Sequence, residues 1–122
     1  MEIKILKLKE GDDVIESLKE YASKNGIQQA YIKEAEGKIK DFEISAFSGR
    51  GSIENYRDRN SQDIIAINGQ ITSSKGEPIV QLKVSVARAG LNAISGLLLS
   101  AKAGESLDIA IEKRDLSKMI YA

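Results

Sequence analysis

The chain has 122 residues, the size of one ordinary domain, and its 18 basic and 18 acidic residues leave no net charge. That balance disfavours a non-specific nucleic-acid binder, which is normally strongly basic. Cysteine and histidine are both absent, which excludes disulfides and thiolate metal sites and removes the commonest general base. The sequence shows no secretory h-region and no apolar run of membrane length, so we expect a cytoplasmic protein without a cofactor.

The N-terminal residues predict a short amphipathic strand. Over residues 2–9, Ile3, Ile5 and either Leu6 or Leu8 are expected on the apolar face, with Lys4 and Lys7 outside. One face of this strand should therefore contribute to the core.

The next segment predicts the main helix of the chain. Asp13 and Glu16 have the spacing of a capping box, and apolar residues then recur at helical spacing. Asn25-Gly26 is a helix stop, because glycine tolerates the left-handed conformation at a helix end. We therefore expect one helix over residues 12–25.

The middle of the chain predicts strands. Residues 27–36 and 38–47 are expected to form a hairpin that turns at Glu36-Gly37. Residues 53–61 are the most polar stretch and predict a loop or an exposed edge strand. The strand predicted at 62–72 has apolar side chains on both faces, which indicates an interior strand or a subunit contact.

The most apolar segment spans residues 78–103. Within it, the aliphatic residues of 80–86 alternate with polar ones, a pattern typical of a strand with one buried face. Residues 91–101 suit a helix as well as a strand, and the pattern alone leaves both open. A turn is expected at 103–105, before a last strand over 106–112.

The run GEPIVQLKVSV, followed by ISGLLLSAKAGESLDIAIE, resembles the PPC domain. That domain occurs in small archaeal and bacterial proteins and, in plants, after AT-hook DNA-binding motifs. The family pattern is His-x-His on one strand, then a turn and Gly-Gly-His-Leu. This chain has Gln81 and Lys83 at the first two histidine positions, and Ser95, Gly96 and Leu97 at the second motif. All three signature histidines are therefore replaced.

The resemblance covers roughly the whole chain and implies a single domain over 1–122, a homotrimer, and a strand rather than a helix at 91–101. Together with the patterns above, it predicts an α+β fold. We expect a curved antiparallel sheet of about six or seven strands, with the helix at 12–25 packed across one side. The strands at 62–72 and 93–101 have more apolar surface than one helix can cover, which is compatible with a trimer.

The polar residues of the apolar segment are the first candidate site. Gln81, Lys83 and Ser85 form a stripe that faces either a pocket shared between subunits or open water, and both interpretations stay open. In a pocket, Lys83 would favour an anionic partner. The candidate ligand-binding residues are Gln81, Lys83, Ser85, Ser95, Gly96 and Asp63. No residue is predicted to be catalytic or to bind a metal.

A second candidate site is the basic cluster formed by Arg50, Arg57 and Arg59, which could contact nucleic-acid phosphates. Glu54 and Asp58 lie among these arginines. A solvated, self-paired loop is therefore the favoured interpretation of the cluster.

Three functions are compatible with the sequence. The first is a non-enzymatic homotrimeric module for regulation or interaction in a prokaryotic cell, with a protein or DNA as a further partner and no membrane. The second is a ligand-binding or catalytic protein that uses a pocket between subunits around Gln81 and Lys83. The third is a weak direct DNA binder, although the chain has no AT-hook. No transition metal is expected, because imidazole and thiolate ligands are missing.

Overall fold

The computed structural model describes residues 2–47, 51–88 and 90–114. Within these ranges, strands make up about 74% of the structure and one short helix is present. The elements follow each other along the chain as β1 (Glu2–Leu8), α1 (Val14–Lys24), β2 (Gln29–Phe47), β3 (Ile53–Asp58), β4 (Gln62–Ser74), β5 (Glu77–Arg88) and β6 (Leu91–Lys113).

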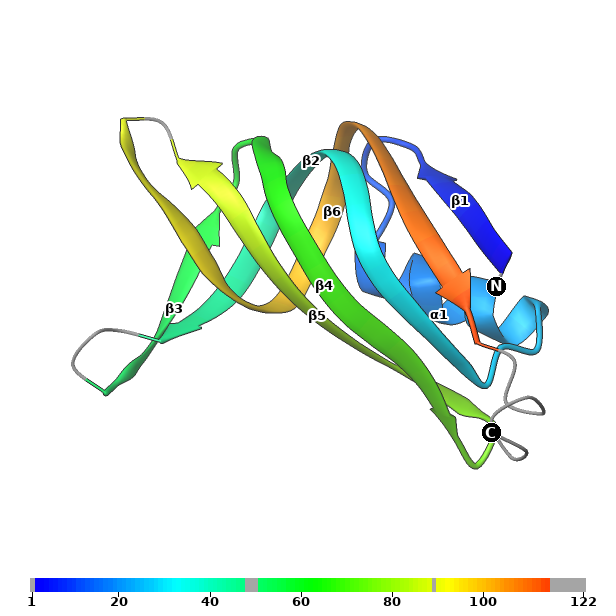
Figure 1. Ribbon diagram of the computed structural model, residues 1–122. Helices are drawn as coiled ribbons and strands as arrows, with labels where there is room; N and C mark the ends of the chain where they lie inside the picture. Colours follow the sequence, from blue (N-terminus) through cyan, green and yellow to red (C-terminus); the bar gives the residue numbers. More distant parts are fainter. Residues whose placement is uncertain (1, 48–50, 89, 115–122) are drawn as a thin grey trace.

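The strands close into a barrel. All pairings are antiparallel, and the strand order is β1-β6-β5-β4-β2-β3 with an additional pairing between β6 and β2. That pairing joins β2, β4, β5 and β6 into a closed ring, to which β1 and β3 are added (Figure 1). The prediction of an α+β fold with helix 12–25 packed on an open curved sheet is therefore wrong. Side-chain alternation identifies strands but not which strands pair with each other, so it does not show that the sheet closes on itself.

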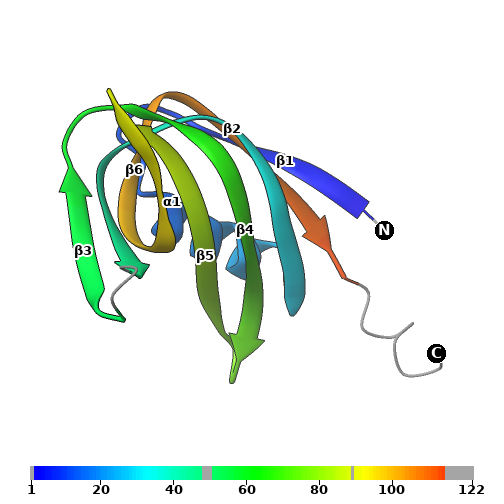
Figure 2. The same cartoon turned by 60° about the vertical axis from the view of Figure 1, so that its left-hand side comes forward.

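The two longest strands, β2 and β6, run without a break through the glycines where turns were predicted (Figure 2). A side chain on Gly37 would collide with the backbone of Ser106, and one on Gly104 would collide with Lys38. Gly37 also has a φ of 135°, and the β2–β6 register shifts just after it. These glycines therefore mark a close approach and a bend of two paired strands, and the predicted turns at Gly37 and Gly104 are wrong.

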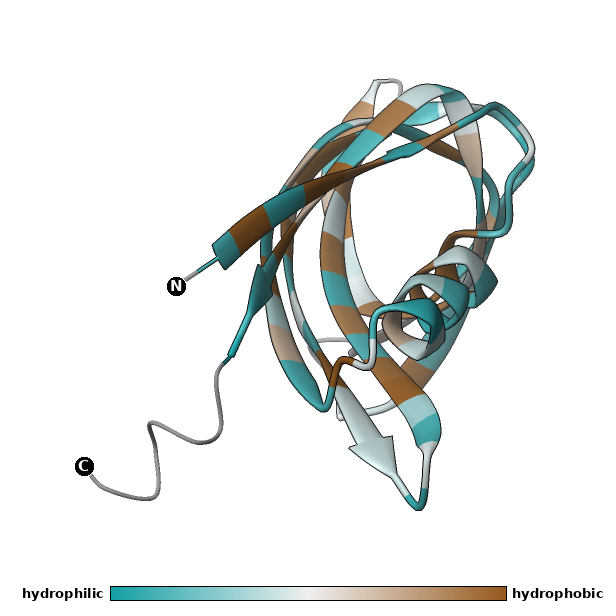
Figure 3. Ribbon diagram, turned by 90° about the vertical axis from the view of Figure 1, so that its right-hand side faces the viewer, coloured by the Kyte–Doolittle hydropathy of each residue, from teal (hydrophilic) through white to brown (hydrophobic). Residues whose placement is uncertain are grey.

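The helix forms where the sequence predicts it. The Asp13 side chain accepts a hydrogen bond of 2.9 Å from the Glu16 backbone N–H, which caps the first turn. Its apolar stripe buries Val14, Leu18 and Ala22, and α1 contacts β4, β5 and β6 at one side of the barrel opening (Figure 3). None of the helices in the described ranges is long and apolar enough to cross a membrane.

The barrel interior is filled by alternating apolar side chains from the four closed strands. Leu82, Val84 and Val86 of β5 point inward and are almost fully buried, as the alternation predicts. Leu98 and Ala101 of β6 join the same core, so the strand rather than the helix is confirmed for 91–101. Side chains that carry nitrogen or oxygen are absent from the buried set, within the ranges that the structure describes.

Two strands expose apolar residues that the sequence analysis assigned to a buried face. In β1, Leu8 is buried and Leu6 half-buried, which agrees with the predicted apolar face, while Ile3 and Ile5 are exposed, so the prediction is wrong for the two isoleucines. In β4, a bulge between the pairs of Ile64 and Ala66 leaves Ile65 exposed although Ile67 and Ile71 are buried. The prediction of apolar groups on both faces of β4 is confirmed, but the bulge changes which residues share a face.

Candidate interaction surface

Strands β4, β5 and β6 place a mixed polar and apolar face on the outside of the barrel. Lys83 pairs with Asn68 on one side and with Leu97 on the other. In the next outward row, Ser85 pairs with Ala66 and with Ser95. Because side chains alternate along a strand, these rows face outward while their neighbours along β5 fill the core.

These rows line a hollow of about 530 Å³, which we call the Lys83 hollow. Ser45 of β2 completes its polar wall, and Leu97 and Ala66 form apolar parts of the lining. The Oγ atoms of Ser85 and Ser95 are 2.5 Å apart and share one hydrogen bond. The Lys83 ammonium is the only formal charge in the lining, and it makes no ion pair within the described part of the chain. The hollow therefore presents one cation among hydroxyl groups and an amide.

The structure brings four of the six predicted ligand-binding residues together in this hollow: Lys83, Ser85, Ser95 and Gly96. Gly96 lies where a side chain would collide with the backbone of Ser45, so it allows β6 to approach β2 closely. The other two lie outside the lining. Gln81 is one outward position further along β5 and accepts a hydrogen bond of 3.4 Å from Gln70. Asp63 is exposed on β4, opposite Lys38 of β2.

One arginine of the predicted basic cluster is paired with a carboxylate, and a second lies near carboxylates. Arg57 lies on β3, an exposed edge strand that pairs only with β2, and its guanidinium is 3.1 Å from the Glu43 carboxylate. Arg59 follows β3 and lines the same shallow hollow as Asp41, Asp58 and Glu43. Arg50 lies outside the described residues. Since carboxylates lie between these guanidiniums, the described residues of this hollow form no basic patch for phosphates.

The end of β3 also contains the group with the clearest electrostatic perturbation. Burial raises the pKa of Tyr56, and the Asp58 charge and hydrogen bond, at 3.3 Å, raise it further. The Arg88 guanidinium, 5.5 Å from the ring centroid, opposes this pKa shift. Tyr56 packs partly against the core, 6.2 Å from Phe42, so its role is structural.

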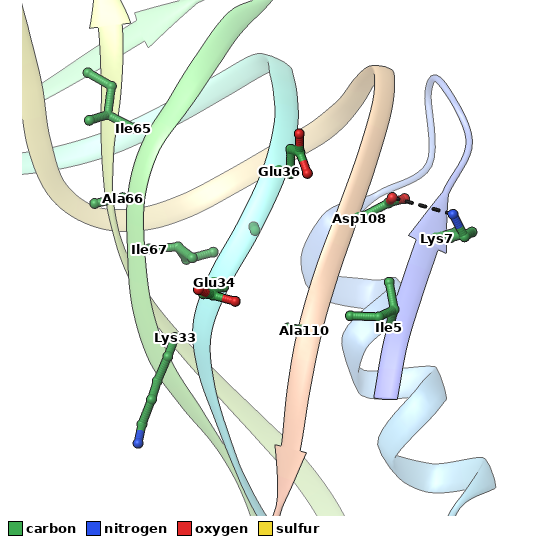
Figure 4. Close-up of a pocket in the computed structure, with 11 residues that line it drawn as sticks. Ile5, Lys7, Lys33, Glu34, Glu36, Ile65, Ala66, Ile67, Asp108 and Ala110 are labelled. Carbon is green, nitrogen blue, oxygen red and sulfur yellow. Dashed lines mark hydrogen bonds and ion pairs between the residues drawn. The ribbon is translucent and has the colours of Figure 1, made fainter. Parts of the chain in front are cut away.

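A second outer hollow, which was not predicted from the sequence, is an acidic groove of about 710 Å³ that crosses β4, β2, β6 and β1 (Figure 4). Glu34 and Glu36 stand along β2 in the middle of this groove, between Ile67 of β4 and Ile5 of β1. Lys7 and Asp108 form an ion pair of 3.4 Å at its edge. The sequence does not predict this site of Glu34 and Glu36, because a hairpin at residues 27–47 does not place them beside β1, β4 and β6. The sequence feature that could have indicated this surface is the presence of apolar residues on both faces of β1.

The acidic groove and the Lys83 hollow adjoin each other, since Ala66 and Ile67 of β4 line both. Large apolar side chains are exposed around them: Ile5 is 55% exposed, Ile65 60% and Leu97 41%. Across the residues that the structure describes, histidine, cysteine, aspartate and glutamate form no cluster of three that could hold a metal ion. The shared feature of these hollows is therefore exposed apolar surface with separated charges.

Solved structures share this barrel. AF0104, a metal-containing protein from Archaeoglobus fulgidus, is 18% identical with a TM-score of 0.78, over 93% of this chain and 79% of that one. A plant- and prokaryote-conserved protein from Pyrococcus horikoshii is 21% identical with a TM-score of 0.77, over 94% and 80%. A "putative DNA-binding protein" from Bacteroides thetaiotaomicron is 20% identical with a TM-score of 0.79, over 93% and 79%.

These identities establish the likeness of fold alone, and no curated protein matches the sequence. The family model of the Plants and Prokaryotes Conserved (PCC) domain matches residues 1–113, which confirms the resemblance to what is also written as the PPC domain. The chain therefore belongs to the Plants and Prokaryotes Conserved domain family.

Proposed function

We propose that the protein is a non-enzymatic interaction module that works as a homotrimer. The observation that carries this proposal is the exposure of Ile5, Ile65 and Leu97 around two adjoining outer hollows. Contiguous apolar surface rimmed by polar groups is typical of protein–protein contacts. A second copy of the chain is the partner that the family resemblance favours, and it would cover this surface.

The composition of the Lys83 hollow supports a role without catalysis. A serine nucleophile needs an adjacent base, yet Ser85 and Ser95 bond to each other, and neither a carboxylate nor an imidazole is among the lining residues that the structure describes. Lys83 is exposed to water, whereas a lysine that acts as a base is normally desolvated.

Metal binding and DNA binding, which the names of two relatives mention, have weaker support in this chain. The Lys83 hollow offers an ammonium, hydroxyls and an amide, a donor set that does not suit a transition metal. For DNA, the net charge is zero and Arg57 is paired with Glu43. The exposed charges of α1 also form ion pairs with each other, so the helix offers no basic face to a groove.

The test is the mass of the purified protein, measured by light scattering during size-exclusion chromatography at micromolar concentration. The expected mass is three times 13.3 kDa, about 40 kDa. We expect Leu97→Ser to shift the protein toward the monomer, because it removes an exposed apolar side chain from the lining of the Lys83 hollow. Ile79→Ser is the matched control, since Ile79 is 44% exposed but lines neither hollow. A wild-type mass near 13 kDa would reject the proposal.

A further inference from the structure

We infer that the subunits assemble head to tail, with the acidic groove of one subunit seated on the Lys83 hollow of the next, so that Lys83 meets Glu34 and Glu36 of its neighbour. This inference rests on the proposed homotrimer. It goes further by naming the two surfaces that are in contact and the charged residues that make this contact favourable.

The acidic groove carries two carboxylates that the described residues do not neutralise. Its lysines are already engaged: Lys7 pairs with Asp108 at 3.4 Å, and Lys33 pairs with Glu112 at 3.6 Å. Glu34 and Glu36 are exposed, and neither makes an ion pair in the described ranges. Figure 4 shows both on β2, apart from the Lys7–Asp108 pair. The groove therefore has an excess of negative charge over an apolar floor.

The Lys83 hollow has the opposite character. Lys83 is its only charged residue, and no carboxylate belongs to its lining within the described ranges. The lining of the hollow also contains the apolar Leu97 and Ala66, and the lining of the groove contains the exposed Ile5 and the small Ala110. Both surfaces thus combine apolar contact area with charges of opposite sign.

The charges also decide the symmetry of the contact. In a two-fold dimer each patch meets its own copy, which would set Glu34 and Glu36 against the same pair, or Lys83 against Lys83. Like charges across an interface are repulsive, whereas the groove against the hollow is attractive. The favoured contact is therefore heterologous, with a different surface contributed by each subunit.

Heterologous contacts form either a ring or an open filament, and the positions of the two surfaces favour a ring. The groove and the hollow share Ala66 and Ile67, so both neighbours of a subunit attach beside the same strand, β4. When the two contact surfaces adjoin, successive subunits follow a curved path rather than a straight one, which favours a closed ring. This arrangement places β4 and its bulged residue Ile65, which is exposed in the single chain, toward the axis of the ring.

A charge exchange tests this inference with the same light-scattering measurement. We expect Lys83→Glu to raise the concentration of half-dissociation by at least about 100-fold, because it brings three carboxylates together. The pair Glu34→Lys with Glu36→Lys should dissociate the protein similarly. The triple variant, which combines all three changes, should restore the trimer. Lys75→Glu, in the exposed β4–β5 turn outside both hollows, should leave the mass unchanged.

All four positions are exposed, and circular dichroism checks that each variant is folded. A Lys83→Glu protein that remains trimeric would overturn the head-to-tail inference while leaving the proposed trimer intact. Dissociation that the triple variant does not reverse would also overturn it, and would point to a bound anion as the partner of Lys83. A monomeric wild type would instead reject the proposed function itself.

Discussion

Lys83 is the residue on which the proposed assembly depends most. Lys83 is exposed in the middle of β5, between Asn68 of β4 and Leu97 of β6, in a hollow whose other polar groups are hydroxyls and an amide. A lysine in water contributes little, but one whose partners are carboxylates on a second surface contributes to the choice of partner. The sequence predicted that Lys83, Ser85, Ser95 and Gly96 share a site. It did not predict which surface faces them.

Tyr56 should make the free energy of unfolding depend on pH. Burial, and then Asp58, raise its pKa, so the folded chain holds the phenol proton more tightly than the unfolded chain does. The free energy of unfolding should therefore be unaffected by this group below about pH 10, and should fall as the pH rises through the folded value. Tyr56→Phe removes this contribution, so the wild type should lose more stability than the variant at high pH.

Urea unfolding of both proteins, from about pH 8 to about pH 11 and at equal protein concentration, measures the difference. Other tyrosines and lysines titrate in the same range, but they are common to both proteins. A difference in unfolding free energy that stays constant over this range would show that the surroundings of Tyr56 do not perturb its titration.

At the scale of elements, the path of β2 and β6 depends on Gly37. A side chain there would overlap the carbonyl oxygen of Ser106, at a φ of 135° that other residues rarely adopt. We expect Gly37→Ala to destabilise the protein by roughly 2–4 kcal/mol, through backbone strain and overpacking together. Urea unfolding at fixed protein concentration measures the loss.

Gly76→Ala is the control for that change. Gly76 also has a positive φ, of 82°, but apart from its chain neighbours no described residue has an atom within 4 Å of the position of an added side chain. Its substitution should cost about 1 kcal/mol, from the backbone conformation alone. Equal losses for Gly37→Ala and Gly76→Ala would mean that β2 and β6 do not approach each other as closely as described.

The elements show what the sequence could predict and what it could not. Helix α1 was predictable because its signals are local: a capping aspartate, Asp13, an apolar stripe and a glycine stop. The strands were predictable from alternation, but their ends were not, because Gly37 and Gly104 have the same local signature in a turn as in a bend of a continuous strand. The pairing of β6 with β2 joins residues far apart in sequence, so no local pattern contains it.

For the whole molecule, closure of the barrel changes what the apolar pattern means. In an open sheet, a second apolar face is covered by a helix, as the sequence analysis expected for part of this chain. In a closed barrel the interior holds one face of each strand, and residues such as Ile65 and Leu97 are left outside. Exposed apolar surface of this kind is commonly covered by a partner molecule, which is why we propose self-association.

Chemical cross-linking tests the proposed self-association directly. The natural chain has no cysteine, so introduced cysteines are the only thiols that react. We would introduce Ile5→Cys in the acidic groove and Leu97→Cys in the Lys83 hollow, singly and together, and treat each folded protein with a flexible bis-maleimide. Head-to-tail contact predicts covalent dimers and trimers on a denaturing gel for the double variant, and monomers for each single variant. Efficient dimers from either single variant, or only monomers from the double variant, would contradict the account.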